Sequence, residues 1–150
     1  MPSRCGRVVL GGRSSSTTRD VAAPDADGRD VRFPADPAWI SRARRSVTRT
    51  AQEAGASPHA LRIIALLTSE AVANAVVHGP PEGEVRVEVE VDDGVIRVGV
   101  RDEGSSMPVR REVPVTAQGG RGVMLIDRLS RQWGVRQEPR GKTVWFEVGL

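Results

Sequence analysis

Two stretches after residue 36 carry apolar residues at helical spacing. The first begins at Asp36-Pro37, which reads as an N-cap followed by proline at the first helical position, and stops at Gly55. The second begins at Ser57-Pro58 by the same logic and runs to about Val77, ahead of Gly79-Pro80-Pro81. The apolar positions are Trp39, Ile40, Ala43, Val47, Ala51 and Ala54 in the first stretch and Leu61, Ile64, Ala65, Thr68 and Val72 in the second.

Strict alternation of apolar and polar residues predicts the strands. Residues 85–91 alternate valine with charged side chains, Asp92-Asp93-Gly94 is a hairpin turn signal, and residues 96–100 continue the alternation on a return strand. A short edge strand is expected over residues 29–33, stopped by Pro34. A final hairpin is expected from two further segments, residues 133–137 and residues 143–148.

The pattern breaks over residues 103–121, which hold Gly, Ser, Pro and charges, and a helix is expected from residue 122 to about 129. A long loop without regular structure inside a compact domain is usually functional or disordered. The order of strand, helix, helix, two strands, loop, helix and two strands predicts the α+β class. It favours a two-layer sandwich with helices on one face of a mixed, mostly antiparallel sheet. Residues 1–28 lack periodicity and are expected to be a disordered tail, so the domain would span residues 29–150.

Composition narrows the class of protein. The chain has 150 residues, 39% hydrophobic and 27% charged, which suits one globular domain. We expect no membrane span and no signal peptide, and the single cysteine, Cys5, fits a reducing compartment, so a cytoplasmic protein is predicted. The pI of about 10.3 could indicate nucleic-acid binding, but the arginines are scattered and only 3% of residues are aromatic. The basic excess suits an acidic protein partner or a nucleotide phosphate as well.

Three polar residues of the second predicted helix, Glu70, Asn74 and His78, lie four apart and therefore share one helix face. An asparagine oxygen is a suitable ligand for Mg²⁺, which keeps waters and substrate phosphates as its other ligands. A glutamate one turn earlier can accept a proton from an attacking hydroxyl or water. By spacing alone, an ordinary solvated helix face explains the same pattern.

Two glycine-containing segments add candidate ligand contacts. Asp102 stands where a valine-rich strand gives way to the loop, where a carboxylate can accept a hydrogen bond from an exocyclic amine, and Gly104 lets the backbone approach a flat ring. Residues 119–123, Gly-Gly-Arg-Gly-Val, precede a helix and expose backbone N–H groups to an anion. Thr143, at the start of the last strand, offers a hydroxyl to the same pocket. A turn, a hinge and a plain strand start are the alternative readings.

Taken together and in this order, the segments resemble the GHKL ATPases, the superfamily of gyrase, Hsp90, histidine kinases and MutL. The likeness is closest to the anti-sigma factor serine kinases and their actinobacterial relatives. Residues 69–79 look like the N box of the family, residues 102–104 like its G1 box, residues 119–123 like its G2 box and residues 141–146 like its closing strand. The resemblance covers roughly residues 30–150 and implies a Bergerat-type ATP-binding fold.

The resemblance also implies roles, with ATP and Mg²⁺ as cofactors. Glu70 would be the general base, Asn74 the Mg²⁺ ligand and Asp102 the carboxylate that reads adenine. The loop over residues 105–118 would be the ATP lid. The remaining implied contacts are Gly104, Gly120, Gly122 and Val123 along the nucleotide, Arg121 and Arg101 as donors to phosphate, Thr143 beside adenine, and His78 as a phosphate contact or a helix cap.

The activity so implied is that of a serine/threonine protein kinase and anti-sigma factor. Its partners would be an anti-anti-sigma protein of the STAS type and a sigma factor, and a homodimer is plausible. In the family the G1 box often reads Asp-x-Gly-x-Gly, whereas here Gly104 is followed by Ser105-Ser106. This departure leaves open a second function, a nucleotide-binding module that sequesters a partner with little or no kinase activity. A histidine kinase core and a DNA-binding regulator fit the sequence less well, since no phosphoacceptor helix and no recognition helix are evident.

Overall fold

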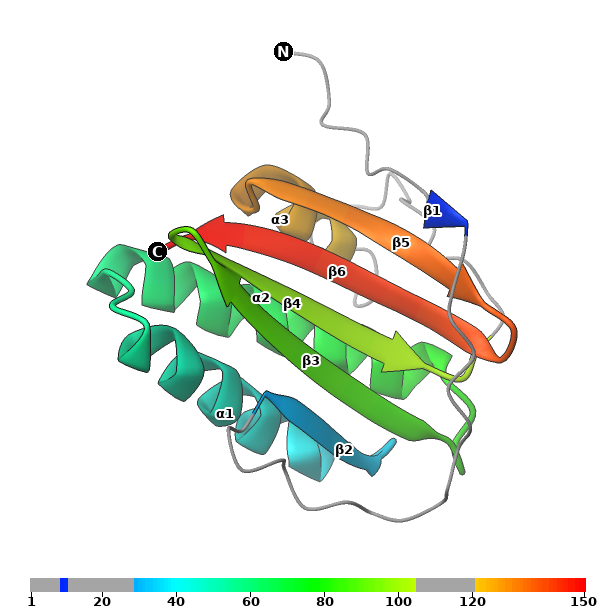
Figure 1. Cartoon of the computed structure of the whole chain (residues 1–150). Helices are drawn as coiled ribbons and strands as arrows, with labels where there is room; N and C mark the ends of the chain where they lie inside the picture. The colour runs from blue at the N-terminus through cyan, green and yellow to red at the C-terminus, as the bar shows by residue number, and fades with distance from the viewer. Residues whose placement is uncertain (1–8, 11–28, 105–120) are drawn as a thin grey trace.

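The computed structural model describes residues 9–10, 29–104 and 121–150. Within these residues the strands form one six-stranded sheet in the order β1-β5-β6-β4-β3-β2 (Figure 1). Every neighbouring pair is antiparallel except β1 and β5, which are parallel. The strands are β1 (Val9–Leu10), β2 (Asp30–Pro34), β3 (Glu84–Asp92), β4 (Val95–Asp102), β5 (Gln132–Glu138) and β6 (Gly141–Gly149).

The three described α-helices lie together on one face of the sheet (Figure 1). They are α1 (Ile40–Glu53), α2 (Pro58–His78) and α3 (Arg121–Leu129). In this layer α2 is central, since it packs against α1 and α3 and also contacts β4 and β6. The predicted α+β class, with helices on one face of a mixed and mostly antiparallel sheet, is confirmed.

The starts of the first two helices follow from the predicted caps, with one difference. The Asp36 carboxylate accepts a hydrogen bond from the backbone N–H of Ala38 at 2.9 Å, but this cap opens a 3-10 turn over Pro37–Trp39, and the α-helix proper begins at Ile40. At α2 the Ser57 hydroxyl accepts from the N–H of Ala60 at 3.1 Å, as expected for an N-cap. Side-chain caps therefore satisfy backbone donors at the start of the 3-10 turn and at the start of α2, whereas the N-cap of α1, Trp39, makes no side-chain hydrogen bond.

The core lies between the helices and the inner face of the sheet. In β3 and β4 every second residue is apolar, mostly valine, and points inward, so the polar residues between them face away from the helices. Near the edge at β2 the rings of Phe33 and Trp39 stack with centroids 5.9 Å apart. The largest fully buried side chains are Phe33, Phe146, Ile64, Leu67, Ile96, Ile126, Val47, Val72, Val85, Val87, Val98 and Val100.

The helix α2 corrects one expectation. No membrane span was expected, yet by length and composition alone this helix is apolar enough to cross a membrane. Its apolar side chains are explained by its central position, because Ile64, Leu67 and Val72 are fully buried against the sheet and the neighbouring helices. We therefore interpret α2 as the core helix of the domain.

Strand β1 was not predicted from the sequence. Val9 and Leu10 pair in register with Arg136 and Gln137 of β5, at one edge of the sheet. The rest of the expected disordered tail, residues 1–8 and 11–28, lies outside the described residues, and so does the expected ATP lid over residues 105–118. The boundary at residue 29 stays a prediction.

Candidate functional site

A small cavity of about 20 Å³ lies between the C-terminal half of α2 and the sheet, next to the end of β4 and the start of β6. Asp102, the last residue of β4, is the cross-strand partner of Lys142 on β6, and both side chains line this cavity. The full lining is Ala71, Asn74, Ala75, His78, Val100, Asp102, Val123, Lys142 and Val144.

The stripe predicted on α2 is brought to this cavity in part. Asn74 and His78 line it, together with the small side chains of Ala71 and Ala75, which keep the helix close to the sheet. Glu70 is half-buried one turn before Asn74 on the same helix face, but it lies outside the cavity lining. Of the three polar residues on this helix face, Asn74 and His78 therefore line the cavity and Glu70 lies outside it.

Three glycines surround Asp102 at distances that exclude a side chain. A Cβ at Gly79 would lie 3.3 Å from the Asp102 Cβ and 2.7 Å from the backbone oxygen of Ala75. A Cβ at Gly104 would lie 2.9 Å from Asp102 Oδ1, and one at Gly141 would overlap the Asp102 backbone oxygen. Gly104 was predicted from the sequence, but the packing roles of Gly79 and Gly141 depend on contacts between segments far apart in the chain.

The Asp102 carboxylate is almost fully buried and has two kinds of partner. Its Oδ1 accepts a hydrogen bond from the Gly104 backbone N–H at 2.7 Å. Its Oδ2 lies 3.7 Å from Lys142 Nζ, and each of these two side chains is only 4% exposed. Burial raises the pKa of Asp102 above its usual value, while the Gly104 N–H, the Lys142 ammonium and His78 act in the opposite direction.

Lys142 was missed by the sequence analysis, although two signals pointed to it. It is the only lysine of the chain, and it lies on the same face of the strand as Val144 and Phe146, which are buried in the core. A lysine in such a position is seldom buried without a charged or polar partner. The structure supplies that partner as Asp102.

The start of α3 borders the cavity. Val123 is buried and lines it, so the first turn of the helix, which contains Arg121 and Gly122, lies next to the space beside Asp102. Only the backbone of Arg121 and Gly122 is described, and Gly120 lies outside the described residues. The backbone N–H groups of a helix start offer hydrogen bonds and a partial positive charge to an anion.

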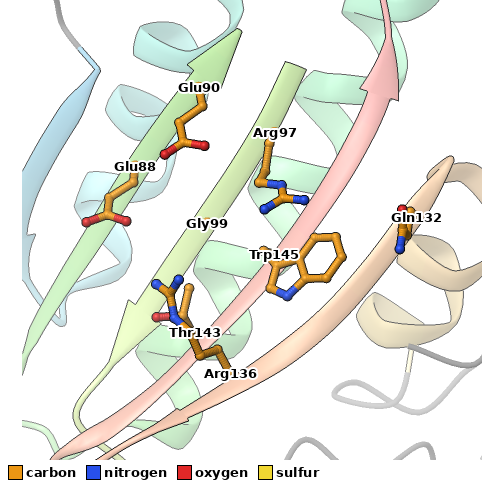
Figure 2. A pocket seen from close by; sticks show the side chains of 8 residues that line it. All are labelled: Glu88, Glu90, Arg97, Gly99, Gln132, Arg136, Thr143 and Trp145. Atoms are coloured by element: carbon orange, nitrogen blue, oxygen red, sulfur yellow. The ribbon is translucent and has the colours of Figure 1, made fainter. Parts of the chain in front are cut away.

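Thr143 and Arg101 are not brought to the cavity. Thr143 Oγ1 donates to Glu138 Oε1 at 3.1 Å, and Arg101 Nε forms an ion pair with Glu138 Oε2 at 2.7 Å. Thr143 borders a separate hollow of about 250 Å³ on the sheet face opposite the helices, which also holds the side chains of Arg97 and Trp145 (Figure 2). Because successive residues of a strand point to opposite faces, Lys142 rather than Thr143 faces the cavity. The expected roles of Thr143 beside adenine and of Arg101 as a phosphate donor are not supported by these positions.

The donor set of the cavity can be tested against the implied magnesium ion. Within residues 9–10, 29–104 and 121–150, no group of three or more His, Cys, Asp or Glu side chains is placed to hold a metal. Mg²⁺ is commonly bound by one or two protein oxygens together with substrate phosphates and water, rather than by an all-protein cage. The Asn74 amide therefore fits a metal that arrives with a nucleotide.

Comparison with known proteins gives the family. Residues 33–148 match the family model described as the histidine kinase-like ATPase domain. The chain is 32% identical over 114 residues to "Serine-protein kinase RsbW" of Listeria innocua serovar 6a, covering 66% of this chain and 73% of that protein. It is also 32% identical over 96 residues to "Anti-sigma F factor" of Geobacillus stearothermophilus, covering 56% of this chain and 66% of that protein.

A solved structure, the histidine kinase domain of the blue-light activated histidine kinase of Erythrobacter litoralis EL346, is 22% identical with a TM-score of 0.49. That alignment covers 79% of this chain and 62% of the solved chain, so this chain spans less than two thirds of it. The family match, by contrast, takes in most of the domain, including α1, α2, the cavity residues and nearly all of β6. The chain belongs to the histidine kinase-like ATPase domain family.

Proposed function

We propose that the protein is an ATP-dependent serine/threonine protein kinase and anti-sigma factor that uses Mg²⁺. The observation that carries the proposal is the buried Asp102 carboxylate, which is packed among three glycines and lines a small cavity together with Asn74. The names of the two relatives, a serine-protein kinase and an anti-sigma factor, support the choice of reaction and of partners.

Each residue of the cavity has a role in this proposal. Asp102 accepts a hydrogen bond from the exocyclic amine of adenine, and the first turn of α3 faces the phosphates. Asn74 offers its amide oxygen to Mg²⁺. Bound Mg-ATP supplies the phosphoryl group, and the metal offsets the charge on the transferring phosphate.

Glu70 is the proposed general base. It lies one helical turn from Asn74 on the same helix face, where the Cβ atoms of neighbouring positions are about 5–6 Å apart. It is half-buried and outside the cavity lining, so a hydroxyl entering from solvent can reach it. There the carboxylate accepts the proton of a partner serine as phosphoryl transfer proceeds.

The proposed partners are an anti-anti-sigma protein of the STAS type, which receives the phosphate, and a sigma factor, which the protein holds. We expect the protein to act in the cytoplasm without direct nucleic-acid contacts, and homodimerisation stays a prediction. Sedimentation of the purified chain alone and with each partner measures these assemblies.

Transfer of labelled phosphate from γ-labelled ATP to a candidate anti-anti-sigma protein tests the reaction. We expect label on a partner serine. Glu70→Gln should lose that label and still bind ATP, and in Asn74→Ala the binding of ATP should no longer depend on Mg²⁺. Gln132→Ala is the matched control, because Gln132 is exposed on the sheet face opposite the helices and should leave transfer unchanged. Full transfer by Glu70→Gln would rule out the assigned base.

A second function, a nucleotide-binding module that sequesters a partner with little or no kinase activity, is suggested by the G1 box, in which Ser105-Ser106 follow Gly104. At about 20 Å³ the cavity holds little more than one water, so an adenine ring enters only if the surrounding segments move apart. A protein with this property could sequester a partner and release it on binding nucleotide, with little transfer. ATP binding that changes partner affinity without labelling any partner serine would support this function over the kinase.

A further inference from the structure

We propose that Lys142 is a specificity-determining residue of the nucleotide pocket, whose ammonium donates a hydrogen bond to the ring nitrogen N1 of adenine while Asp102 accepts one from the neighbouring N6 amine. The inference rests on the proposed function, in that it takes the cavity beside Asp102 to be the site of the base.

Burial is the first observation behind this role. The Lys142 side chain is only 4% exposed, and it lines the same cavity as Asp102. Removing an ammonium group from water is costly unless charged or polar groups compensate it, so a lysine is seldom fully buried without a partner. Asp102 lies 3.7 Å away, which is an ion pair longer than an ordinary hydrogen bond. An ammonium has three N–H donors, so contact with Asp102 is compatible with a further acceptor on a ligand.

Register gives the second observation. Asp102 and Lys142 are directly opposite on β4 and β6, and both point toward the helices. Side chains in such a cross-strand pair start about 4.5–5.5 Å apart, so their polar ends can contact adjacent atoms of one small ring. The sheet therefore presents an acceptor and a donor side by side at one end of the cavity.

The edge of adenine matches this pair. Its N6 amine is a donor and the adjacent N1 is an acceptor, so the amine faces the Asp102 carboxylate and N1 faces the Lys142 ammonium. Guanine placed in the same orientation brings its O6 acceptor against the carboxylate and its N1–H donor against the ammonium. A buried polar group left without a partner is costly, so the pair should discriminate adenine from guanine.

The experiment is a calorimetric titration of wild type and Lys142→Met with ATP, with 1-deaza-ATP and with 7-deaza-ATP. The first analogue replaces N1 with C–H, and the second changes an atom on the other side of the base. Methionine keeps most of the stem that packs beside Val144, and circular dichroism and thermal unfolding check the fold of the variant. We expect wild type to bind 1-deaza-ATP about 10-fold to 100-fold more weakly than ATP, as for loss of a hydrogen bond to a charged group. We expect 7-deaza-ATP to bind like ATP, and Lys142→Met to bind all three nucleotides with similar affinity.

A second measurement avoids dependence on the variant. Because Lys142 is the only lysine, protein made with ¹⁵N-labelled lysine has a single lysine side-chain resonance. We expect ATP to shift this resonance and 1-deaza-ATP to shift it much less.

The outcomes separate the two proposals. If wild type binds ATP and 1-deaza-ATP equally, or if Lys142→Met binds ATP more tightly than wild type, the role of Lys142 is overturned while the ATP site stands. If wild type binds no ATP, the proposed function fails and the role of Lys142 fails with it.

Discussion

Gly141 gives the sharpest test of how the pocket is built, through the substitution Gly141→Ala. Its φ is 144°, a conformation that residues with a side chain rarely adopt. An added Cβ would overlap the backbone oxygen of Asp102 and lie 3.0 Å from the Cα of Glu103. Both obstacles are backbone atoms of the end of β4, so no side-chain rotation relieves the overlap.

The expected cost has two parts. A side chain in a sparsely populated backbone conformation costs about 1–3 kcal/mol. Overpacking against backbone adds about 1–3 kcal/mol, since β4 and β6 must move apart beside Asp102 and Lys142. The total, roughly 4 kcal/mol, is a large share of the ~5–15 kcal/mol that stabilises an ordinary domain. For a chain of this size it lowers the melting temperature by about 8–16 °C.

Two other glycines separate these parts. Gly55 has a φ of 87° and nothing within 4 Å of an added Cβ, so Gly55→Ala should cost only the backbone strain, about 1–2 kcal/mol. Gly149, in the same strand as Gly141, has open space and no positive φ, so Gly149→Ala should change stability by less than about 0.5 kcal/mol. Urea unfolding of the three variants measures the differences. If Gly141→Ala costs no more than Gly55→Ala, the packing of β6 against Asp102 is not as tight as we infer.

Three further predictions concern the fold and the carboxylate. Ser57→Ala removes the N-cap of α2 and should lower the free energy of unfolding by about 1 kcal/mol, read from the urea midpoint; an unchanged midpoint would show that the cap is dispensable. Ile126→Ala removes a fully buried side chain of α3 and should cost about 2–5 kcal/mol by the same assay, and a cost below about 1 kcal/mol would contradict the packing of α3. Burial raises the pKa of Asp102, so its carboxylate takes up a proton at a higher pH than a free aspartate, with an ordinary pKa of about 3.9. ATP affinity in calorimetry should therefore weaken as pH falls, beginning above that value. In Asp102→Asn, only the pH dependence of ATP affinity that is due to the phosphates should remain. Identical pH profiles for wild type and Asp102→Asn would count against the carboxylate as the base-reading group.

The elements of the fold were largely predictable, because their signals are local. Helical spacing, strand alternation and the cap at Ser57 each depend on residues close in sequence, and they gave α1, α2, α3 and the four long strands. The same local rule placed Asn74 and His78 on one helix face. The two-residue strand β1 is too short to carry a periodic signal, and the start of α1 shifted because the cap at Asp36 opens a 3-10 turn first.

The face on which β6 presents each side chain was decided only by the tertiary structure. Residues 141–146 are all buried, because β6 is an inner strand with helices on one side and, on the other, side chains such as that of Arg97, which lies over the Trp145 ring. Alternation between buried and exposed residues is therefore absent, and a one-residue error of register exchanges Lys142 for Thr143. Thus the sequence by itself determined the fold class and the polar stripe of α2, since both follow from spacing along one segment. The partnership of Asp102 with Lys142 and the glycines that surround it arose only when strands and helix ends distant in sequence came into contact.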